Sequence, residues 1–185
     1  MKAEWAIWRG AFSPDECESI LRRSDNLPTF QANQGLNGEN PDLRYRRSKL
    51  KWMKEDIYRD VFDKMWRMTI QTNEQFFGFH IDNLEFMQLG EYHSRDRGEY
   101  KRHHDVFWLN GSPKHRKLSV VLQLTDPSKY EGGQLSIAVQ NEQPKDYFGQ
   151  GTVIWFPSFL EHWVTPVTKG VRHSVVCWFE GPDWR

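Results

Sequence analysis

The segment YKRHHDVFW places two histidines directly before an aspartate. In an extended chain, side chains two residues apart point to the same face, and neighbouring side chains point to opposite faces. His103 and Asp105 can therefore converge on one ligand, whereas His104 faces away from it. The same spacing recurs at His80 and Asp82 in FGFHIDN, so the spacing alone does not select the functional pair.

His162 is a third candidate ligand, just after the apolar run TVIWF. Two histidines and one carboxylate are the donor set of the facial triad, which binds Fe(II) and leaves positions open for a co-substrate and dioxygen. A structural zinc site would instead close its fourth position with a protein ligand. The alternative is that each histidine only satisfies hydrogen bonds in the core. We expect that role for His93, His115 and His173, which have no partner pattern.

Helical patterns dominate the chain up to about residue 75. In SPDECESILRR, Ser13 as N-cap, Pro14 at the first helical position and Glu16 as the capping-box partner predict a helix over about 14–25. In EDIYRDVFDKMWRMTIQ, apolar residues recur at helical spacing and predict an amphipathic helix over about 55–72 that packs on a sheet. The residues of this apolar stripe are Ile57, Val61, Met65 and Met68.

From residue 76 to about 181 the chain changes to short strand-like runs separated by turn signals. The runs are FFGFHI, LEFMQLGEY, KLSVVLQLT, GQLSIAV, GTVIWF and VRHSVVCWF. Helices followed by many strands predict an α+β chain whose second part is a jelly roll or barrel.

Length and composition favour one domain over residues 1–185. Lysine plus arginine and aspartate plus glutamate both number 25, so no net charge attracts nucleic acid or an anionic membrane. The sequence shows no signal-peptide pattern and no apolar stretch long enough to span a membrane, so we expect no membrane association. Cys17 and Cys177 do not form a disulfide framework, and Cys177 lies in an apolar run where a buried thiol is expected. These features favour a reducing, cytoplasmic location.

Two further segments have open interpretations. The segment LPTFQANQGLNGENPDL is rich in Gly, Asn and Pro, which predicts a surface loop, and we expect its 31–42 stretch to act as a lid. The basic run over 44–54, LRYRRSKLKWM with Lys54, fits either a strand with one solvated face or a nucleic-acid-binding stripe, and the strand is favoured.

The order of the motifs over about 84–180 resembles the Fe(II)- and 2-oxoglutarate-dependent dioxygenases, especially the prolyl and lysyl hydroxylase branch that includes the prolyl 4-hydroxylases. GEYKRHHD resembles the family's Tyr-x-x-His-x-Asp at Tyr100, His103 and Asp105. The strand, turn and Gly-Gly strand that follow in the family resemble LSVVLQLTDPSKYEGGQLSI. The family's closing signature, with its distal histidine at His162, resembles GTVIWFPSFLEHWVTPVTKGVRHSVVCWF. The resemblance implies that His103, Asp105 and His162 bind the iron.

His80 and Asp82 precede the run LEFMQLGEY instead of following it. They do not match the family order, and we expect them to be surface or packing residues. His104 points away from the metal-binding face, and we expect it to contact neighbouring structure or substrate.

The resemblance also implies a set of residues that bind 2-oxoglutarate. Arg172 offers a planar, charged fork to the far carboxylate, and the alternation of VRHSVVCWF puts Trp178 on the same face. Tyr92 and Tyr100 offer phenol hydrogen bonds, although their separation is one residue longer than in the family pattern. Gln123 stands where some relatives have a tyrosine, so this chain departs from the family there.

The implied fold is a double-stranded β-helix, a jelly-roll core of the cupin type, with N-terminal helices packed on one sheet. The implied reaction hydroxylates an unactivated C–H bond and uses Fe(II), 2-oxoglutarate and dioxygen, with release of succinate and CO2 and ascorbate as an optional reductant. A prolyl residue of a protein or peptide is the favoured substrate. A lysyl residue, a free amino acid or another small molecule remain alternatives, and the oligomeric state is not predicted.

Other classes of protein fit the sequence less well. A nucleic-acid dealkylase of the same superfamily would resemble its relatives in a second arginine shortly after Arg172, which RHSVVCWFEG lacks. A halogenase would have a small residue in place of Asp105. A non-catalytic cupin-like binding module or a zinc hydrolase would not release succinate in a reaction that depends on Fe(II) and 2-oxoglutarate.

Overall fold

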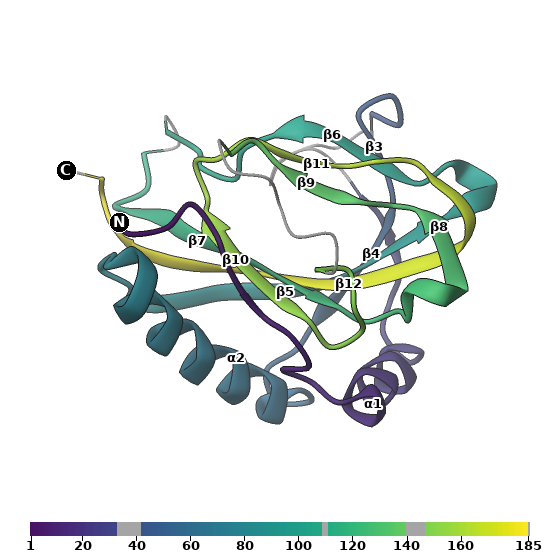
Figure 1. The fold of residues 1–185 in the computed structure, drawn as a ribbon, viewed down its shortest axis with the longest axis horizontal. Coiled ribbons are helices and arrows are strands. Elements are labelled where there is room, and N and C mark those ends of the chain that lie inside the picture. Colours follow the sequence, from purple (N-terminus) through teal and green to yellow (C-terminus); the bar gives the residue numbers. More distant parts are fainter. Residues whose placement is uncertain (33–41, 109–110, 140–146, 185) are drawn as a thin grey trace.

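The computed structural model describes residues 1–32, 42–108, 111–139 and 147–184. Within them, two antiparallel β-sheets lie against each other, and the helices cover the outer face of the larger sheet (Figure 1). The larger sheet has the order β1-β10-β7-β12-β5-β4-β2, with β8 also paired to β12, and the smaller sheet has the order β3-β6-β11-β9. This arrangement confirms the predicted α+β class and the jelly-roll core with helices on one sheet.

The elements have the following bounds in chain order. They are β1 (Ala6–Trp8), α1 (Pro14–Ser24), β2 (Phe30–Gln31), β3 (Arg46–Arg47), β4 (Lys49–Met53), α2 (Arg59–Thr72), the π-helical turn η1 (Asn73–Phe77), β5 (Asn83–His93), the 3₁₀ turn η2 (Ser94–Asp96), β6 (Glu99–His103), β7 (Lys114–Gln123), the 3₁₀ turn η3 (Pro127–Lys129), β8 (Tyr130–Gly132), β9 (Leu135–Ile137), β10 (Val153–Pro157), β11 (His162–Val164) and β12 (Val167–Pro182).

The first helix begins at the predicted capping box. The Ser13 hydroxyl accepts a hydrogen bond from the Glu16 backbone N–H at 3.2 Å, and the Glu16 carboxylate accepts one from the Ser13 N–H at 2.7 Å. The box satisfies two N–H groups that the helix itself cannot pair. α1 ends at Ser24, one residue before the predicted end.

The second helix begins four residues later than predicted. The carbonyl of Lys54 accepts hydrogen bonds from the N–H groups of Ile57 and Tyr58, which closes a turn before α2 starts at Arg59. Tyr58 is fully buried at this start, whereas Ile57 is 44% exposed, so the prediction that Ile57 belongs to the apolar stripe was wrong. The rest of the stripe, which comprises Val61, Met65 and Met68, is buried as predicted.

The run FFGFHI does not form the predicted strand. The turn η1 continues α2 through Phe77, and Gly78 ends it in the left-handed conformation with φ of 70°. The Asn73 side chain then bonds both the N–H and the carbonyl of Phe79, at 2.9 and 2.8 Å. Because a side chain satisfies these backbone groups, no strand pairing is needed, and β5 begins only at Asn83.

The basic run over 44–54 forms strands, and its exposed basic residues, Arg44 and Lys54, lie outside these strands. β3 pairs with β6 and β4 pairs with β5, and this pairing turns Arg46 and Lys51 inward, where both are buried. Lys51 lies 3.0 Å from Glu91, which compensates its charge, whereas Trp52 is exposed. The favoured interpretation was therefore right about the strand and wrong about its solvent-facing charges.

The core has two parts, one on each side of the larger sheet. Between this sheet and the helices, Trp155 of β10 is fully buried, and its indole N–H donates to Thr69 of α2 at 2.9 Å. A second apolar cluster lies between the two sheets. Cys17 and Cys177 are both free and buried, and burial had been expected for Cys177.

The expected lid and the expected lack of a membrane-spanning segment can be compared only with the described residues. The proposed 31–42 lid lies mostly outside the described residues, which leaves it a prediction. No helix in the described ranges has the length and apolarity needed to cross a membrane.

Candidate active site

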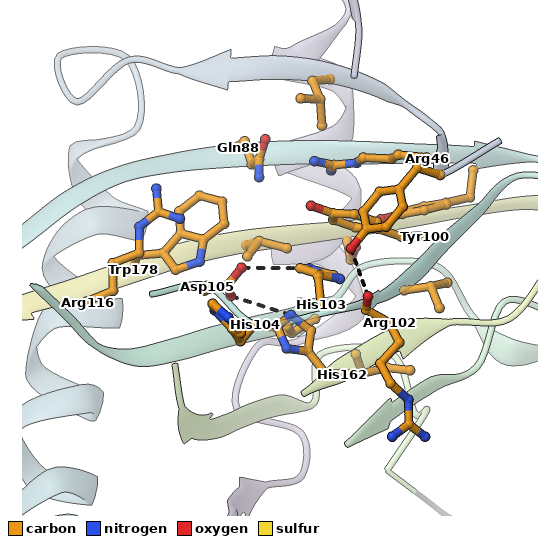
Figure 2. Close-up of a pocket in the computed structure, with 18 of the residues that line it drawn as sticks. Arg46, Gln88, Tyr100, Arg102, His103, His104, Asp105, Arg116, His162 and Trp178 are labelled. Carbon is orange, nitrogen blue, oxygen red and sulfur yellow. Dashed lines mark hydrogen bonds and ion pairs between the residues drawn. The ribbon is translucent and has the colours of Figure 1, made fainter. Parts of the chain in front are cut away.

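The smaller sheet brings three potential metal ligands together at one edge of the space between the sheets. His103 is the last residue of β6, His162 is the first of β11, and the two lie opposite each other in the strand register. Asp105 follows β6 after one intervening residue. Their ligand atoms all lie within 4.8 Å of one another (Figure 2). His162 Nε2 is 3.4 Å from Asp105 Oδ2, and His103 Nε2 is 3.7 Å from Asp105 Oδ1.

Backbone contacts orient both imidazole rings. His103 Nδ1 lies 2.7 Å from the carbonyl oxygen of Lys101, and His162 Nδ1 lies 3.1 Å from that of Leu160. Because a carbonyl oxygen can only accept, each Nδ1 carries the proton in these contacts. The two Nε2 lone pairs are therefore directed at the site, as in metal-binding histidines.

The protonation states also suit metal binding. Burial lowers the pKa of His103, and the neighbouring His162 lowers it further, so the neutral ring is favoured. Burial alone would raise the pKa of Asp105, but the facing histidines, Arg116 and a hydrogen bond from Ser119 outweigh burial and lower it. The structure thus favours a neutral imidazole beside an ionised carboxylate, the forms that bind a divalent metal.

The rival His-x-Asp pair does not converge in this way. His80 is exposed, and Asp82 forms a surface ion pair with Lys114 at 2.8 Å. This placement agrees with the expectation of surface or packing residues.

A cavity of about 850 Å³ extends from the triad between the two sheets. Arg172 of β12 reaches into it with a side chain that is only 1% exposed. Its Nη2 donates to the Gln123 side-chain oxygen at 2.9 Å, and its guanidinium lies 5.4 Å from the centre of the Tyr92 ring. In the described ranges, no carboxylate lies within ion-pair distance of Arg172, and both Arg172 Nε and Gln123 Nε2 are buried without a partner.

The other predicted site residues lie in different parts of the cavity. The Tyr100 ring stacks on the His103 ring with centroids 3.6 Å apart. Trp178 shares the cavity-facing side of β12 with Arg172, as the alternation predicted. However, it lies six residues further along the strand, beside Arg116, whose guanidinium is 4.1 Å from the Trp178 ring. His104 also lines the cavity, on its exposed side.

Two buried arginines of the cavity were not predicted from the sequence. Arg116 is paired with Glu85 at 2.6 Å, and Arg46 lies over the Tyr100 ring at 4.3 Å. Local sequence gave no signal for them, because the burial of each arginine depends on which strands pair within a sheet. Net charge could not reveal them, since it does not distinguish a buried cation from a solvated one.

The remaining histidines contact protein groups. His173 Nδ1 lies 3.1 Å from the Thr125 hydroxyl, and His93 Nε2 lies 3.4 Å from Glu91. His115 Nε2 lies 3.7 Å from Asp183. These contacts confirm that all three have structural partners.

The model of the 2OG-Fe(II) oxygenase superfamily matches residues 65–180. The match includes the triad, Arg172 and the strands of the larger sheet from β5 onward, except the last two residues of β12. The chain belongs to this superfamily.

Curated relatives include the PKHD-type hydroxylase YbiX of Escherichia coli O1:K1 and that of Shigella boydii serotype 18. Each is 30% identical to this chain over 108 residues, which is 58% of this chain and 39% of the relative. The match thus spans well under half the length of these relatives.

Solved structures share the fold at low sequence identity. The viral collagen prolyl hydroxylase vCPH of Paramecium Bursaria Chlorella virus-1 has a TM-score of 0.72 and 18% identity, and covers 97% of both chains. A Pseudomonas putida prolyl-4-hydroxylase has a TM-score of 0.75 and 19% identity, and covers 97% of this chain and 94% of its own. A prolyl hydroxylase of Trichoplax adhaerens, in complex with a hypoxia inducible factor peptide, has a TM-score of 0.76 and 16% identity, and covers 95% and 83%.

Proposed function

We propose that this chain is an Fe(II)- and 2-oxoglutarate-dependent dioxygenase that hydroxylates a prolyl residue of a protein or peptide. The observation that carries the proposal is one cavity holding both a His-Asp-His cluster and a buried arginine that has no carboxylate partner among the described residues. In the overall reaction, R–H, 2-oxoglutarate and O2 give R–OH, succinate and CO2. The prolyl substrate is inferred from the prolyl hydroxylases among the solved structures with the same fold.

The residues fit the iron that the superfamily implies. Two imidazole nitrogens and one carboxylate make a mixed donor set that suits Fe(II), and three protein ligands leave the other octahedral positions open. The site has no cysteine to favour zinc in a closed tetrahedral site.

The residues also fit 2-oxoglutarate, whose far carboxylate needs a cationic donor at some distance from the metal. Arg172 Nε and Gln123 Nε2 are buried donors with no acceptor among the residues that the structure describes, which is costly unless a ligand supplies one. A carboxylate between them would satisfy both groups and would neutralise the arginine.

In this mechanism the chain supplies geometry, charge and a dry cavity, while bound iron would use dioxygen as the oxidant and 2-oxoglutarate as the source of two electrons to attack an unactivated C–H bond. His103 and His162 present Nε2 to the metal, and Ser119 holds the Asp105 carboxylate. Arg172 and Gln123 hold the far carboxylate. Apolar side chains between the sheets exclude water from this end of the cavity.

Four other residues complete the proposed site. Tyr92 supports the Arg172 guanidinium, and Tyr100 stacks on the His103 ring and fixes its orientation. Trp178, together with Arg116, forms a wall further along the cavity, where the organic substrate would enter.

We further propose ascorbate as a reductant of iron that has been oxidised without product formation. A reducing, cytoplasmic location suits the two free thiols.

Mass spectrometry of a peptide panel tests the substrate. Purified protein would be incubated with Fe(II), 2-oxoglutarate and matched peptides that contain prolyl, lysyl or neither residue, alongside the free amino acids and an alkylated oligonucleotide. We expect prolyl peptides to gain one oxygen atom, together with stoichiometric succinate, only when both Fe(II) and 2-oxoglutarate are present. Oxygen gain confined to another substrate class would overturn the prolyl assignment, and absence of succinate with every substrate would overturn the dioxygenase.

A further inference from the structure

Arg46 is a second buried cation in the cavity, and it has no role in the mechanism above. It begins β3, which pairs with β6 so that Arg46 lies opposite Tyr100. Its side chain is only 6% exposed and lines the same cavity as the triad. Figure 2 shows it extending over Tyr100 in the direction of Gln88, whose side chain is buried in the same cavity wall.

The protein satisfies the Arg46 guanidinium only in part. Its Nε donates to the Ser48 hydroxyl at 2.9 Å, and its central carbon lies 4.3 Å from the Tyr100 ring centroid. In the described part of the chain, no side chain accepts a hydrogen bond from either terminal nitrogen of Arg46, and no carboxylate lies within 4.0 Å of it. A buried cation left in this state is costly unless a ligand supplies the missing negative charge.

The other arginines of the cavity are accounted for. Arg102 lies 3.1 Å from Glu161, and Arg116 lies 2.6 Å from Glu85. Arg172 has no carboxylate from the described residues, but under the proposed function it binds the far carboxylate of 2-oxoglutarate. Arg46 is then the arginine for which neither the described protein nor the co-substrate provides a counter-charge.

Charge balance leads to the same conclusion. The two charges of Fe(II) and the charge of Arg172 are offset by Asp105 and by the two carboxylates of 2-oxoglutarate. One positive charge, that of Arg46, remains in a buried cavity with the site fully loaded. A substrate with a single negative charge would neutralise it.

We propose that Arg46 binds a carboxylate of the organic substrate, which makes this protein selective for substrates with a carboxylate close to the oxidised carbon. Arg46 lies over Tyr100, and Tyr100 stacks directly on His103, so only one ring separates the guanidinium from a proposed metal ligand. A guanidinium offers two parallel N–H groups to a carboxylate, which fixes both its position and its orientation. The inference rests on the proposed function and narrows its substrate class.

Two sources of the carboxylate are chemically equivalent at Arg46. One is the main-chain carboxylate of a free amino acid or of a C-terminal residue, and the other is the side chain of an acidic residue next to the target. Two pairs of probes distinguish them. N-acetyl-L-proline is paired with its amide, and acetyl-prolyl-glutamate amide is paired with acetyl-prolyl-glutamine amide.

Calorimetric titration of the protein loaded with Mn(II) and 2-oxoglutarate, without dioxygen, would measure the binding of these probes. In at least one pair, the carboxylate should bind about tenfold or more tightly than its neutral partner, since hydrogen bonds to charged groups are among the strong ones. Arg46→Gln should abolish that preference, and Arg46→Lys should retain part of it. Arg47→Gln is the matched control, because Arg47 is the next residue of β3 and pairs with Glu99 outside the cavity. It should keep the preference.

Several results would overturn the inference. Equal affinity within both pairs for the wild-type protein would remove the anion site, as would a preference that persists in Arg46→Gln. A loss of 2-oxoglutarate affinity in Arg46→Gln as large as that in Arg172→Gln would reassign Arg46 to the co-substrate. A preference that depends on Arg46, without hydroxylation of any prolyl peptide, would support the anion site and contradict only the prolyl substrate.

Discussion

The Asp105 carboxylate is positioned by a short chain of hydroxyl groups. Ser119 of β7, which is fully buried, donates to Asp105 Oδ2 at 2.6 Å, and the Ser158 hydroxyl lies 3.0 Å from that of Ser119. A hydrogen bond to one carboxylate oxygen restricts the rotation of the group and leaves the other oxygen for a metal. Retention of the metal should therefore depend on a residue that never touches it.

Ser119→Ala is expected to weaken Fe(II) binding by about 10- to 100-fold, the range typical of partners that orient a metal ligand. Ser158→Ala should have a smaller effect, because the bond from Ser119 to Asp105 remains. Metal titration of both variants without dioxygen would measure this. Equal affinity of Ser119→Ala and the wild type would show that Asp105 needs no such support.

Arg172→Lys should weaken 2-oxoglutarate binding while keeping the metal. Lysine preserves the charge but loses the planar fork, and one hydrogen bond to a charged group is typically worth about 1.5–3 kcal/mol. The 2-oxoglutarate dissociation constant should rise by roughly one to two orders of magnitude. Calorimetry for 2-oxoglutarate and metal analysis on one preparation would separate the two effects. An unchanged constant, or joint loss of fold and metal, would mean that Arg172 is a structural residue.

At the scale of single residues, the sequence predicted the site residues whose grouping follows from their spacing within one segment. His103 and Asp105 are two apart on an extended segment, and Arg172 alternates with Trp178 on one strand, so local geometry was enough to group them. Arg46 and Arg116 depend on which strands pair. Pairing joins residues far apart in the chain, and local periodicity carries no information about it.

At the scale of elements, one tight connection holds the N-terminal part on the larger sheet. Gly151 has φ of 76°, its carbonyl accepts from the Phe12 N–H at 3.0 Å, and its N–H donates to Gln123 at 2.8 Å. A Cβ added at Gly151 would overlap the carbonyl oxygen of Phe12. Gly10 also has a positive φ, of 59°, but a Cβ there would meet no atom within 4 Å.

Gly151→Ala should therefore cost more stability than Gly10→Ala. The left-handed conformation alone costs a non-glycine residue about 1–2 kcal/mol, which is the change expected for Gly10→Ala. At Gly151 the overlap adds to this cost and forces the connection to move. Urea denaturation of both variants would compare their free energies of unfolding. Equal losses would mean that the backbone near Phe12 yields easily.

Elements with strong local signals were predicted, and those set by competing contacts were not. The Ser13 capping box defined the start of α1, because it is a contact within four residues. The end of α2 at Thr72 was predicted, but the strand expected at FFGFHI was wrong, because the Asn73 side chain replaces strand hydrogen bonds at Phe79. The start of α2 was missed because Tyr58 takes the buried position that periodicity assigned to Ile57.

At the scale of the whole molecule, the free energy of unfolding should decrease as the pH is lowered, and His173 is one cause. Burial is the main cause that lowers the pKa of His173 in the folded state from its ordinary value of 6.5. The Thr125 hydroxyl oxygen accepts from the His173 backbone N–H at 2.8 Å, so its proton is free for His173 Nδ1. This contact favours the neutral ring.

The sign of the pH effect follows from proton binding. As pH falls below 6.5, the unfolded chain protonates His173 while the folded chain resists, so the unfolded state gains protons and stability decreases. His173→Asn should remove this contribution and lose less stability on acidification than the wild type. Urea denaturation above and below pH 6.5 would measure it, with the exposed His80→Asn as control. A loss in His173→Asn as large as that of the wild type would contradict the assignment.

Fe(II)-dependent release of succinate from 2-oxoglutarate, measured with a prolyl peptide, tests the central claim most directly when three proteins are compared. The wild type and His80→Ala should both release succinate, because His80 lies on the surface away from the triad. His103→Ala should release almost none, because it lacks one of three metal ligands. Succinate release by His103→Ala at the wild-type rate, or loss of release in a folded His80→Ala, would contradict the proposed iron site.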